Sequence, residues 1–357
     1  GKNLVRGLKK LHPGIELRGM GGDGLAGEGM SLVKHIRETN FMGFTQVLAN
    51  LGTIRRMFRD VKADILKFKP DAVVLIDYPG FNMRMAKWLK KQGIKVFYYI
   101  SPTVWAWKKG RMHKLIPNVE RLFAILPFEQ PFYAKEGYEV EYHGHPLLDE
   151  VQNHPNNREE TRRRLLDPDE RLVALLPGSR KQEITRMLPQ MLAIKGRFPR
   201  SRFVVAAAPT MGDEIYAEII GNMDIPVLRG HTYDLLAAAD AALVTSGTAT
   251  LETALFGVPQ VVCYAANSLS VWIARRLIHV RFISLVNLIL DREVVRELIQ
   301  NDLHPEALAA ELRRLLDDQQ RRATLRKDYS ELMGKIGEPG SSERVAKRIL
   351  ELLGALS

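Results

Sequence analysis

Short runs of apolar residues alternate along the chain with longer segments whose apolar residues recur every three or four positions. The short runs are rich in Val, Ile and Leu, which is typical of buried β-strands, and the longer segments are typical of amphipathic helices. This alternation predicts parallel α/β sheets, because each helix carries the chain back over the sheet and covers one face. We predict strands at 73–77, 96–100, 122–126, 173–176, 203–207, 242–245 and 260–264.

A polar stretch divides this pattern in two. Residues 152–169 are rich in Asn, Pro, Arg and Glu and offer few side chains for a core, which is typical of a hinge. The length of 357 residues also favours two domains. We therefore predict an N-terminal domain over 1–165, a C-terminal domain over 166–330, and a helical segment over 331–357. That last segment could pack on either domain, including back on the N-terminal one.

The first residues predict a helix, with Leu4, Leu8 and Leu11 on one face. A parallel α/β domain normally opens with a strand and a glycine turn before its first helix. We therefore expect a strand and a loop to precede Gly1.

The predicted helix over 47–68 has an unusual second face. Its main apolar stripe is typical of packing on a core. Beside and before the stripe lie aromatic, aliphatic and cationic side chains: Phe41, Met42, Phe44, Leu48, Arg55 and Arg59. That mixture suits the interface of an anionic membrane. A partly exposed surface helix is the alternative.

The charge indicates an acidic partner. The net charge is +11, from 52 Lys and Arg against 41 Asp and Glu, which suits nucleic acid, an anionic membrane or a phosphorylated substrate. Nucleic acid is the weakest of these, because the chain has neither zinc-finger cysteines nor an aromatic-rich RNA-binding strand. A general surplus for solubility is the alternative. No apolar run predicts a transmembrane helix, and we expect the single Cys263 in the core.

Two loops of the C-terminal half carry the most specific chemistry. The strand at 173–176 is followed by a turn with Gly178, and then by Ser179 and Arg180 at the start of a helix. Amides at a helix N-terminus attract phosphate, and a guanidinium adds two parallel hydrogen bonds to diphosphate oxygens. A plain β-turn with a surface arginine is the alternative.

The second loop follows the strand at 242–245 and contains Ser246, Gly247 and Thr248, with Glu252 one turn into the next helix. Small residues let the backbone approach a diphosphate, and the carboxylate can accept hydrogen bonds from both hydroxyls of a ribose. An ordinary N-terminal cap is the alternative. Two such loops in one α/β domain favour a nucleotide that lies across the strand ends.

The N-terminal half contains candidates for an acceptor site. Asp77 ends a predicted strand and should face the ligand crevice, where it could act as a general base toward a hydroxyl. An Asx-turn is the alternative. Ser101, Trp105 and Trp107 follow the next strand and suit a sugar-stacking or acyl-contacting surface, or else a hydrophobic clamp that closes the domain.

Three further motifs carry less weight. Residues 19–24 match the dinucleotide glycine pattern, but glycines stand where its helix is needed, so we predict a loop. Asp167 and Asp169 lie in the polar linker and predict a turn rather than a metal-binding acid pair. His143 and His145 lack a third metal ligand and predict a turn between the domains.

Together these segments resemble glycosyltransferase family 19, the lipid-A-disaccharide synthases, over nearly the whole chain. The segments that carry the resemblance are Asp77 with Pro79, Phe81 and Asn82, then 101–107, 126–129, 144–146, 176–180, 245–252 and 284–287. The most specific of them are 101–107 and 245–252. The chain begins after the position of an acidic glycine loop of the family.

The resemblance implies a GT-B fold, with two Rossmann-like domains whose parallel sheets face each other across a cleft, and no metal or other cofactor. It implies an inverting transfer from UDP-2,3-diacylglucosamine to 2,3-diacylglucosamine 1-phosphate (lipid X), which yields UDP and the β-1,6-linked disaccharide 1-phosphate of lipid A. The catalytic candidates are then Asp77 and Asn82. The UDP-sugar would be bound by Gly178, Ser179, Arg180, Ser246, Gly247, Thr248, Glu252 and Asn287.

The same resemblance implies a cytoplasmic protein on the anionic inner-membrane surface of a Gram-negative bacterium, with no nucleic-acid partner. A homodimer is left open. Two other classes of function also stay open at this stage. Another GT-B enzyme, such as a peptidoglycan N-acetylglucosaminyltransferase or a UDP-GlcNAc 2-epimerase, would bind UDP but ignore acyl chains. A non-catalytic nucleotide- or lipid-binding module would bind the same ligands and release no UDP.

Overall fold

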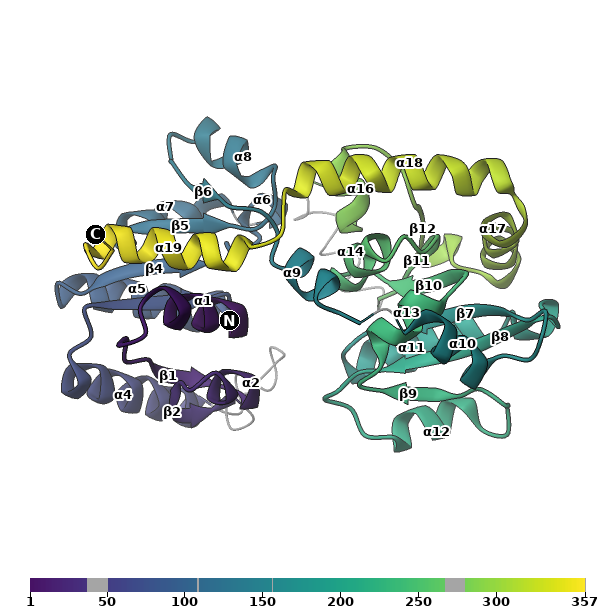
Figure 1. The fold of residues 1–357 in the computed structure, drawn as a ribbon, viewed down its shortest axis with the longest axis horizontal. Coiled ribbons are helices and arrows are strands. Elements are labelled where there is room, and N and C mark those ends of the chain that lie inside the picture. Colours follow the sequence, from purple (N-terminus) through teal and green to yellow (C-terminus); the bar gives the residue numbers. More distant parts are fainter. Residues whose placement is uncertain (37–50, 108, 156, 267–279, 357) are drawn as a thin grey trace. The chain divides into compact units, whose positions relative to one another are not determined.

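The computed structural model describes residues 1–36, 51–107, 109–155, 157–266 and 280–356. The chain forms two compact units (Figure 1). Unit 1 comprises Gly1–Pro146 and Pro339–Ser357, and unit 2 comprises Leu147–Glu338.

Unit 1 is built on a parallel sheet with the strand order β3-β4-β5-β6, and β1 and β2 form a separate parallel pair. Its strands are β1 (Arg18–Gly21), β2 (Ser31–His35), β3 (Ala72–Ile76), β4 (Lys95–Tyr99), β5 (Arg121–Ala124) and β6 (Glu141–Tyr142). Its described helices are α1 (Lys2–Leu11), α2 (Asp23–Gly27), α4 (Leu51–Phe68), α5 (Pro79–Lys91), α6 (Val104–Trp107), α7 (Met112–Leu115), α8 (Glu129–Lys135) and α19 (Ser341–Leu353).

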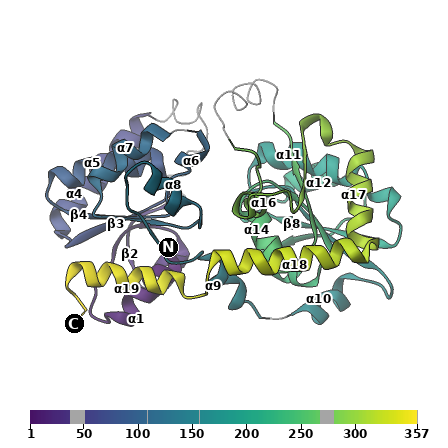
Figure 2. The same ribbon diagram turned by 90° about the horizontal axis from the view of Figure 1, so that it is seen from above.

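The apolar run of β4 is explained by the burial of both its faces. Val96 and Tyr98 belong to the core beneath α4 and α5, whereas Phe97 and Tyr99 belong to the core beneath α1 and α19. Successive side chains of a strand point to opposite faces, so a strand covered on both sides is apolar throughout. The second core depends on the return of the chain, because α19 lies beside α1 (Figures 1 and 2).

Unit 2 contains one parallel sheet with the strand order β12-β11-β10-β7-β8-β9. Its strands are β7 (Arg171–Leu176), β8 (Ser201–Ala207), β9 (Val227–Arg229), β10 (Ala241–Thr245), β11 (Gln260–Tyr264) and β12 (Arg296–Ile299). Its described helices are α9 (Leu147–Gln152), α10 (Arg158–Leu165), α11 (Lys181–Leu192), α12 (Glu214–Ile220), α13 (Thr232–Ala238), α14 (Thr248–Leu255), α16 (Leu285–Leu290), α17 (Pro305–Asp317) and α18 (Gln319–Ile336). The order reverses between β7 and β10, which is the doubly wound arrangement of Rossmann-like domains.

The predicted α/β fold class is confirmed, and each predicted strand overlaps an observed one. The predictions for β3 and β4 ran one residue too far, because Asp77 and Ile100 adopt positive φ angles of 47° and 68° that end the strands. The prediction of a loop at 19–24 was wrong. Gly19 and Gly21 lie in β1, Gly22 caps α2, and α2 begins at Asp23.

The chain passes from unit 1 to unit 2 between Pro146 and Leu147, whereas the sequence placed the boundary after residue 165. The polar stretch belongs to unit 2 because α10 packs on α13. The Arg162 guanidinium on α10 donates hydrogen bonds to the Ala238 carbonyl and to the Asp240 carboxylate. The second passage falls after Glu338, and α19 therefore packs within unit 1.

Two smaller expectations concern the core and the membrane. Cys263 is completely buried in β11, as predicted. Phe58, Val61 and Ile65 of α4 pack against the unit 1 core, as their spacing predicted. None of the described helices is both long and apolar enough to span a membrane.

Candidate functional site

The two glycine loops of unit 2 leave neighbouring strands at the same edge of the sheet. Leu176, the last residue of β7, pairs with Val244 of β10, so both loops start at the point where the strand order reverses. Ligands of open α/β sheets bind outside the carboxyl ends of the strands at such a point. The structure therefore brings the two predicted nucleotide loops together.

The first loop depends on Gly178 for two reasons. Its φ angle is +110°, and a Cβ at this position would lie 2.6 Å from the Cβ of Glu183. Glu183 was not expected in the site, although its position three residues after a helix cap is a known signal. Its Oε2 accepts hydrogen bonds from the backbone N–H groups of Ser179 (2.9 Å) and Arg180 (3.2 Å).

Glu183 therefore accepts hydrogen bonds from the same turn amides that we expected to bind a phosphate. Its Oε1 also accepts a hydrogen bond of 2.6 Å from Nη1 of Arg180. The Arg180 side chain is still 64% exposed. This guanidinium has further N–H groups for a diphosphate, and Gly178 and Ser179 shape the turn that carries it.

The second loop presents a helix N-terminus. Gly247 has a φ angle of +150°, and α14 starts at the next residue. The backbone amides of Thr248 and Ala249 have no hydrogen-bond partner within the described part of the chain. Unpaired amides at the start of a helix form a favourable position for an anion.

Glu252 lies on α14 as predicted, but it has a partner that the sequence did not indicate. The Tyr233 hydroxyl donates a hydrogen bond of 2.8 Å to Glu252 Oε1. The pKa of Glu252 is raised, mainly by burial and also by the nearby Glu150, while the Tyr233 hydrogen bond lowers it. One carboxylate oxygen is thus engaged, and Oε2 has no hydrogen bond within the described residues.

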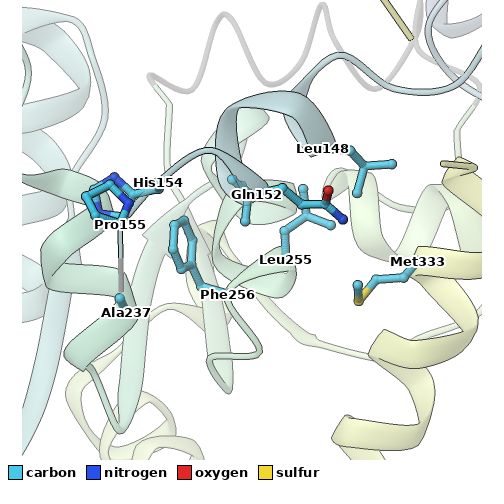
Figure 3. A pocket seen from close by; sticks show the side chains of 9 residues that line it. Leu148, Gln152, His154, Pro155, Ala237, Leu255, Phe256 and Met333 are labelled. Carbon is cyan, nitrogen blue, oxygen red and sulfur yellow. The ribbon is translucent and has the colours of Figure 1, made fainter. Parts of the chain in front are cut away.

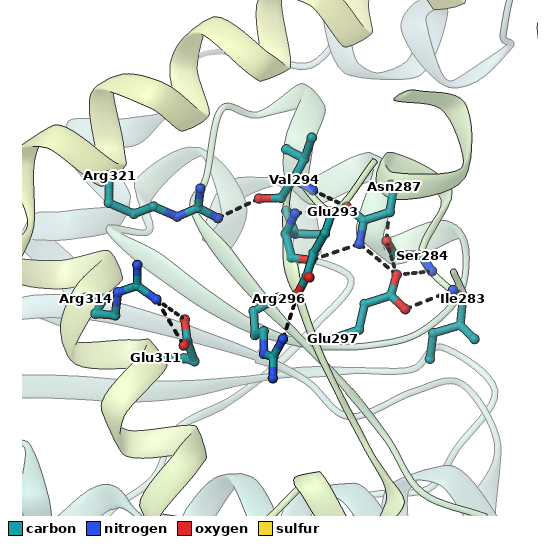
Figure 4. Close-up of polar contacts among 11 residues, drawn as sticks. Ile283, Ser284, Asn287, Glu293, Val294, Arg296, Glu297, Glu311, Arg314 and Arg321 are labelled. Carbon is teal, nitrogen blue, oxygen red and sulfur yellow. Dashed lines mark hydrogen bonds and ion pairs between the residues drawn. The ribbon is translucent and has the colours of Figure 1, made fainter. Parts of the chain in front are cut away.

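Asn287 does not lie where a nucleotide contact was expected. It is completely buried, and its Nδ2 donates to the Val295 carbonyl and to Glu297 Oε1, both at 2.8 Å (Figure 4). Its Oδ1 accepts from the backbone N–H groups of Val294 and Val295. Because the donors and acceptors of this amide are engaged inside unit 2, we correct its assignment from ligand contact to support of the fold beside the loops.

In unit 1, Asp77 lies at the carboxyl end of β3 in an unusual backbone conformation. Asp77 and Tyr78 have φ angles of 47° and 42°, a region that non-glycine residues rarely adopt. Such residues persist only where the surrounding structure holds them, and they cluster at functional sites. The following residue, Pro79, begins α5.

Two side chains hold this strained turn. Asn82 donates through Nδ2 to the carbonyl oxygens of Ile76 (3.0 Å) and Asp77 (2.7 Å). The Tyr98 hydroxyl donates to the Asp77 carbonyl at 2.6 Å. Asn82 is itself buried, so it holds Asp77 in place rather than meeting a ligand.

The Asp77 carboxyl group is reached by solvent. Its pKa is nevertheless raised, mainly because neighbouring groups exclude part of its water, while the Tyr78 backbone N–H acts in the opposite direction. A carboxylate with a raised pKa is a stronger base than an ordinary one. This environment is compatible with the predicted role of Asp77 as a general base.

The segment after β4 is less exposed than predicted. Ser101 is buried, and its hydroxyl forms a hydrogen bond of 2.8 Å with the Tyr133 hydroxyl. It therefore does not lie on an exposed surface for substrate, which corrects the assignment made from the sequence. Trp105 packs edge-on against Phe128, with ring centroids 4.9 Å apart. This arrangement matches the hydrophobic clamp that was the alternative. The side chain of Trp107 lies outside the described part of the structure.

Glu129 is a buried acid that sequence reasoning did not single out by its chemistry. It is 1% exposed, and its Oε2 accepts hydrogen bonds from the backbone N–H groups of Ile125 and Leu126. Burial raises its pKa to about 7, against the opposing effect of these amides.

Glu129 should make the stability of the protein depend on pH. Its pKa is about 7 in the folded chain against an ordinary value of 4.5, so the folded state binds the proton more tightly. The free energy of unfolding should therefore fall by roughly 1–3 kcal/mol as the pH rises through this interval. Glu129→Gln should remove that decrease in urea unfolding measured at several pH values. An equal pH dependence in both proteins would show that Glu129 is not its source.

The predicted membrane face is only partly described. Phe41, Met42, Phe44 and Leu48 lie outside the described residues. Arg55 and Arg59 are exposed on α4, with Arg59 Nε 3.6 Å from Asp60 Oδ1.

The remaining motifs are structural. His143 pairs with Glu141 at 2.9 Å, and His145 is buried, which lowers its pKa to about 4. Residues 167–170 form a turn, as predicted. In the described part of the chain, no group of three His, Cys, Asp or Glu side chains could hold a metal ion.

A pocket of about 360 Å³ in unit 2 contains none of the predicted residues. It lies between α9, α13, α14 and α18 (Figure 3) and is lined by Leu148, Val151, Gln152, His154, Pro155, Ala237, Leu255, Phe256 and Met333. Leu255 and Phe256 stand at the C-terminal end of α14, whereas the second glycine loop precedes its N-terminus. We place the candidate site at the loops, because ligands of parallel sheets bind at the carboxyl ends of the strands.

Comparison with known proteins gives one consistent result. The family described as Lipid-A-disaccharide synthetase matches residues 1–351. The lipid-A-disaccharide synthase of Syntrophus aciditrophicus is 44% identical over 361 residues, covering 99% of this chain and 94% of that protein. That of Geobacter metallireducens is 39% identical over 360 residues, again covering 99% and 94%.

Solved structures share the fold at much lower identity. UDP-GlcNAc 2-epimerase from Neisseria meningitidis bound to UDP-GlcNAc superposes with a TM-score of 0.64 at 11% identity, covering 98% of this chain and 95% of that one. The glycotransferase of kitacinnamycin reaches a TM-score of 0.66 at 16% identity, covering 98% and 94%. The predicted GT-B class, with two Rossmann-like domains, is confirmed by these neighbours.

Proposed function

Because this chain belongs to the lipid-A-disaccharide synthetase family, we propose that it is an inverting glycosyltransferase of lipid A biosynthesis. It joins UDP-2,3-diacylglucosamine to 2,3-diacylglucosamine 1-phosphate (lipid X) and releases UDP and the β-1,6-linked disaccharide 1-phosphate. The observation that carries the proposal is the family match over residues 1–351, which spans both units.

Unit 2 binds the UDP part of the donor in this proposal. The diphosphate meets the Arg180 guanidinium and the unpaired amides of Thr248 and Ala249. These groups stabilise the charge that develops on the leaving group, and we propose that no metal ion is needed for this task. The free oxygen of Glu252 accepts hydrogen bonds from the ribose hydroxyls.

Unit 1 supplies the base. As the 6-hydroxyl oxygen of the acceptor forms its bond to the anomeric carbon, the bond from that carbon to the diphosphate breaks. The hydroxyl proton passes to the Asp77 carboxylate in the same step. Asn82 and Tyr98 act as positioning residues, because they hold the backbone from which this carboxylate projects.

The direct test is to follow UDP release from the protein with both acylated substrates. We expect turnover with UDP-2,3-diacylglucosamine and lipid X together, and none when lipid X is omitted. UDP-GlcNAc should not replace the acylated donor. Conversion of UDP-GlcNAc without an acceptor would instead indicate an epimerase, and binding without any UDP release would indicate a non-catalytic module.

We also propose that α4 contributes to peripheral contact with the anionic inner membrane on its cytoplasmic side. Arg55 and Arg59 are exposed on one side of this helix. An arginine near an anionic lipid surface contributes about 1 kcal/mol. The double variant Arg55→Ala/Arg59→Ala should therefore bind anionic vesicles roughly thirtyfold more weakly in a co-sedimentation assay.

The matched control removes two exposed arginines from unit 2. Arg163→Ala/Arg164→Ala loses the same charge from α10. Binding of the wild type should fall with added salt, because screening weakens the attraction. Equal loss of vesicle binding in both double variants would mean that net charge, rather than the α4 face, determines the contact.

A further inference from the structure

Glu297 forms an unusual set of hydrogen bonds next to the second glycine loop. It lies on β12 at the edge of the unit 2 sheet and is partly buried. Its Oε2 accepts from the Ile283 backbone N–H at 3.0 Å. Its Oε1 accepts from the Ser284 N–H (2.9 Å), the Ser284 hydroxyl (2.8 Å) and Asn287 Nδ2 (2.8 Å) (Figure 4).

These four donors take the place of a cationic partner. Within the described residues Glu297 forms no ion pair, although Arg296 beside it pairs with Glu293. Hydrogen bonds to an ionised group are stronger than those between neutral groups. The carboxylate therefore fixes the segment 283–284 and the start of α16 firmly to β12.

The segment that Glu297 fixes also contacts the second glycine loop at two points. The Ser246 hydroxyl donates to the Ile283 carbonyl at 2.8 Å. The Leu285 backbone N–H donates to Thr250 Oγ1 at 3.2 Å. The Thr250 hydroxyl in turn donates to the Gly247 carbonyl at 2.8 Å. The segment is thus connected to Ser246 directly and to Gly247 through Thr250, and both of these residues precede α14.

We propose that Glu297 is a positioning residue for the donor-binding loop 246–248. It acts on the diphosphate position through Ile283 and Leu285, without touching the nucleotide. This inference rests on the proposed function, in which that loop binds UDP. It also explains why Asn287 is buried here, since that side chain holds both β12 and the start of α16.

The test is UDP binding by Glu297→Gln, measured by calorimetry. A glutamine can keep its oxygen at the position that accepts three hydrogen bonds. Its NH₂ group then faces the Ile283 N–H. Both groups are donors, so the hydrogen bond from Ile283 is lost. We expect the dissociation constant for UDP to rise at least about tenfold, because a charge-assisted hydrogen bond is lost and the loop shifts.

The matched control is Glu293→Gln, which removes an equally charged side chain four residues earlier in the chain, from an exposed ion pair with Arg296. It should bind UDP like the wild type. Far-UV circular dichroism should show that both variants are folded at the assay temperature. If Glu297→Gln does not fold, Ser284→Ala removes one of the four donors and should still weaken UDP binding measurably.

A double-mutant cycle separates positioning from general loss of stability. Thr250→Val keeps the shape of a buried side chain and removes the hydroxyl that links Leu285 to Gly247. If Glu297 acts through this link, the double variant should bind UDP more tightly than the product of the single effects predicts. Wild-type affinity in folded Glu297→Gln, or multiplicative effects in the cycle, would overturn the inference. Absence of UDP binding by the wild type would instead overturn the proposed function.

Discussion

Replacing Asp77 with asparagine should lower turnover by about 10²- to 10⁴-fold while UDP affinity stays near that of the wild type. The acceptor is a primary alcohol, which is far too weak an acid to ionise at neutral pH. A positioned carboxylate that takes its proton contributes roughly this factor to the rate. Asparagine keeps the shape of the side chain and removes the basicity.

The geometry of unit 1 makes this test specific. Asp77 is held in a strained turn by Asn82 and Tyr98, and both hydrogen bonds go to its backbone carbonyl. The substitution therefore changes the carboxylate without removing the contacts that hold the turn. A loss of kcat with unchanged UDP binding is the signature of an interaction made only in the transition state.

The control for this variant is Asp71→Asn. Asp71 is an exposed carboxylate directly before β3, whereas Asp77 directly follows it, so its loss removes the same charge beside the same strand. It should leave turnover unchanged. Normal turnover of Asp77→Asn would place the base elsewhere. Collapse of UDP binding as well would show that Asp77 caps its turn and has a structural role.

Removing the Arg180 guanidinium should weaken UDP binding by about 2–5 kcal/mol, which raises the dissociation constant by at least roughly thirtyfold. This side chain is 64% exposed and retains N–H groups that Glu183 does not engage. A bound diphosphate would remove water from the pair and so strengthen the interaction. Arg180→Lys should recover only part of the affinity, because an ammonium group cannot form two parallel hydrogen bonds.

Arg186→Ala serves as the control for Arg180→Ala. Arg186 is exposed on the same helix, α11, and lies beyond the turn that carries Gly178. Calorimetry should find wild-type UDP affinity in this control. Unchanged affinity in folded Arg180→Ala would mean that the guanidinium does not meet the diphosphate, and that the turn is a plain surface turn.

The two glycine loops were predicted from the sequence, but the side chains that bind to them were not. Gly178 and Gly247 were predicted because glycine after a buried strand marks a sharp change in backbone direction, and both adopt positive φ angles. The hydrogen bonds that Glu183 accepts from the first loop, and that Tyr233 donates to Glu252, were not predicted. Glu183 could have been found from its spacing to the helix cap. Tyr233 could not, because it reaches Glu252 from another helix.

Strands β9 and β12 were missed for a related reason. β9 has only three residues, and β12 begins with Arg296 and Glu297, so neither shows the apolar run of a central strand. β12 forms because β11 offers it a parallel partner, and the Glu297 side chain accepts hydrogen bonds from a segment ten to fourteen residues earlier. A local pattern cannot report such a pairing.

The sequence by itself determined the α/β class, the central strands and the two glycine loops. These features are local: burial on both faces selects apolar runs, and positive φ angles select glycine. Only the tertiary structure decided that residues 147–165 belong to unit 2 and that α19 returns to α1. It alone showed that Ser101 and Asn287 are buried, and that Asn82 and Glu297 hold the groups beside them. The physical reason is that the role of a polar side chain depends on its hydrogen-bond partners, and folding brings those partners from distant segments of the chain.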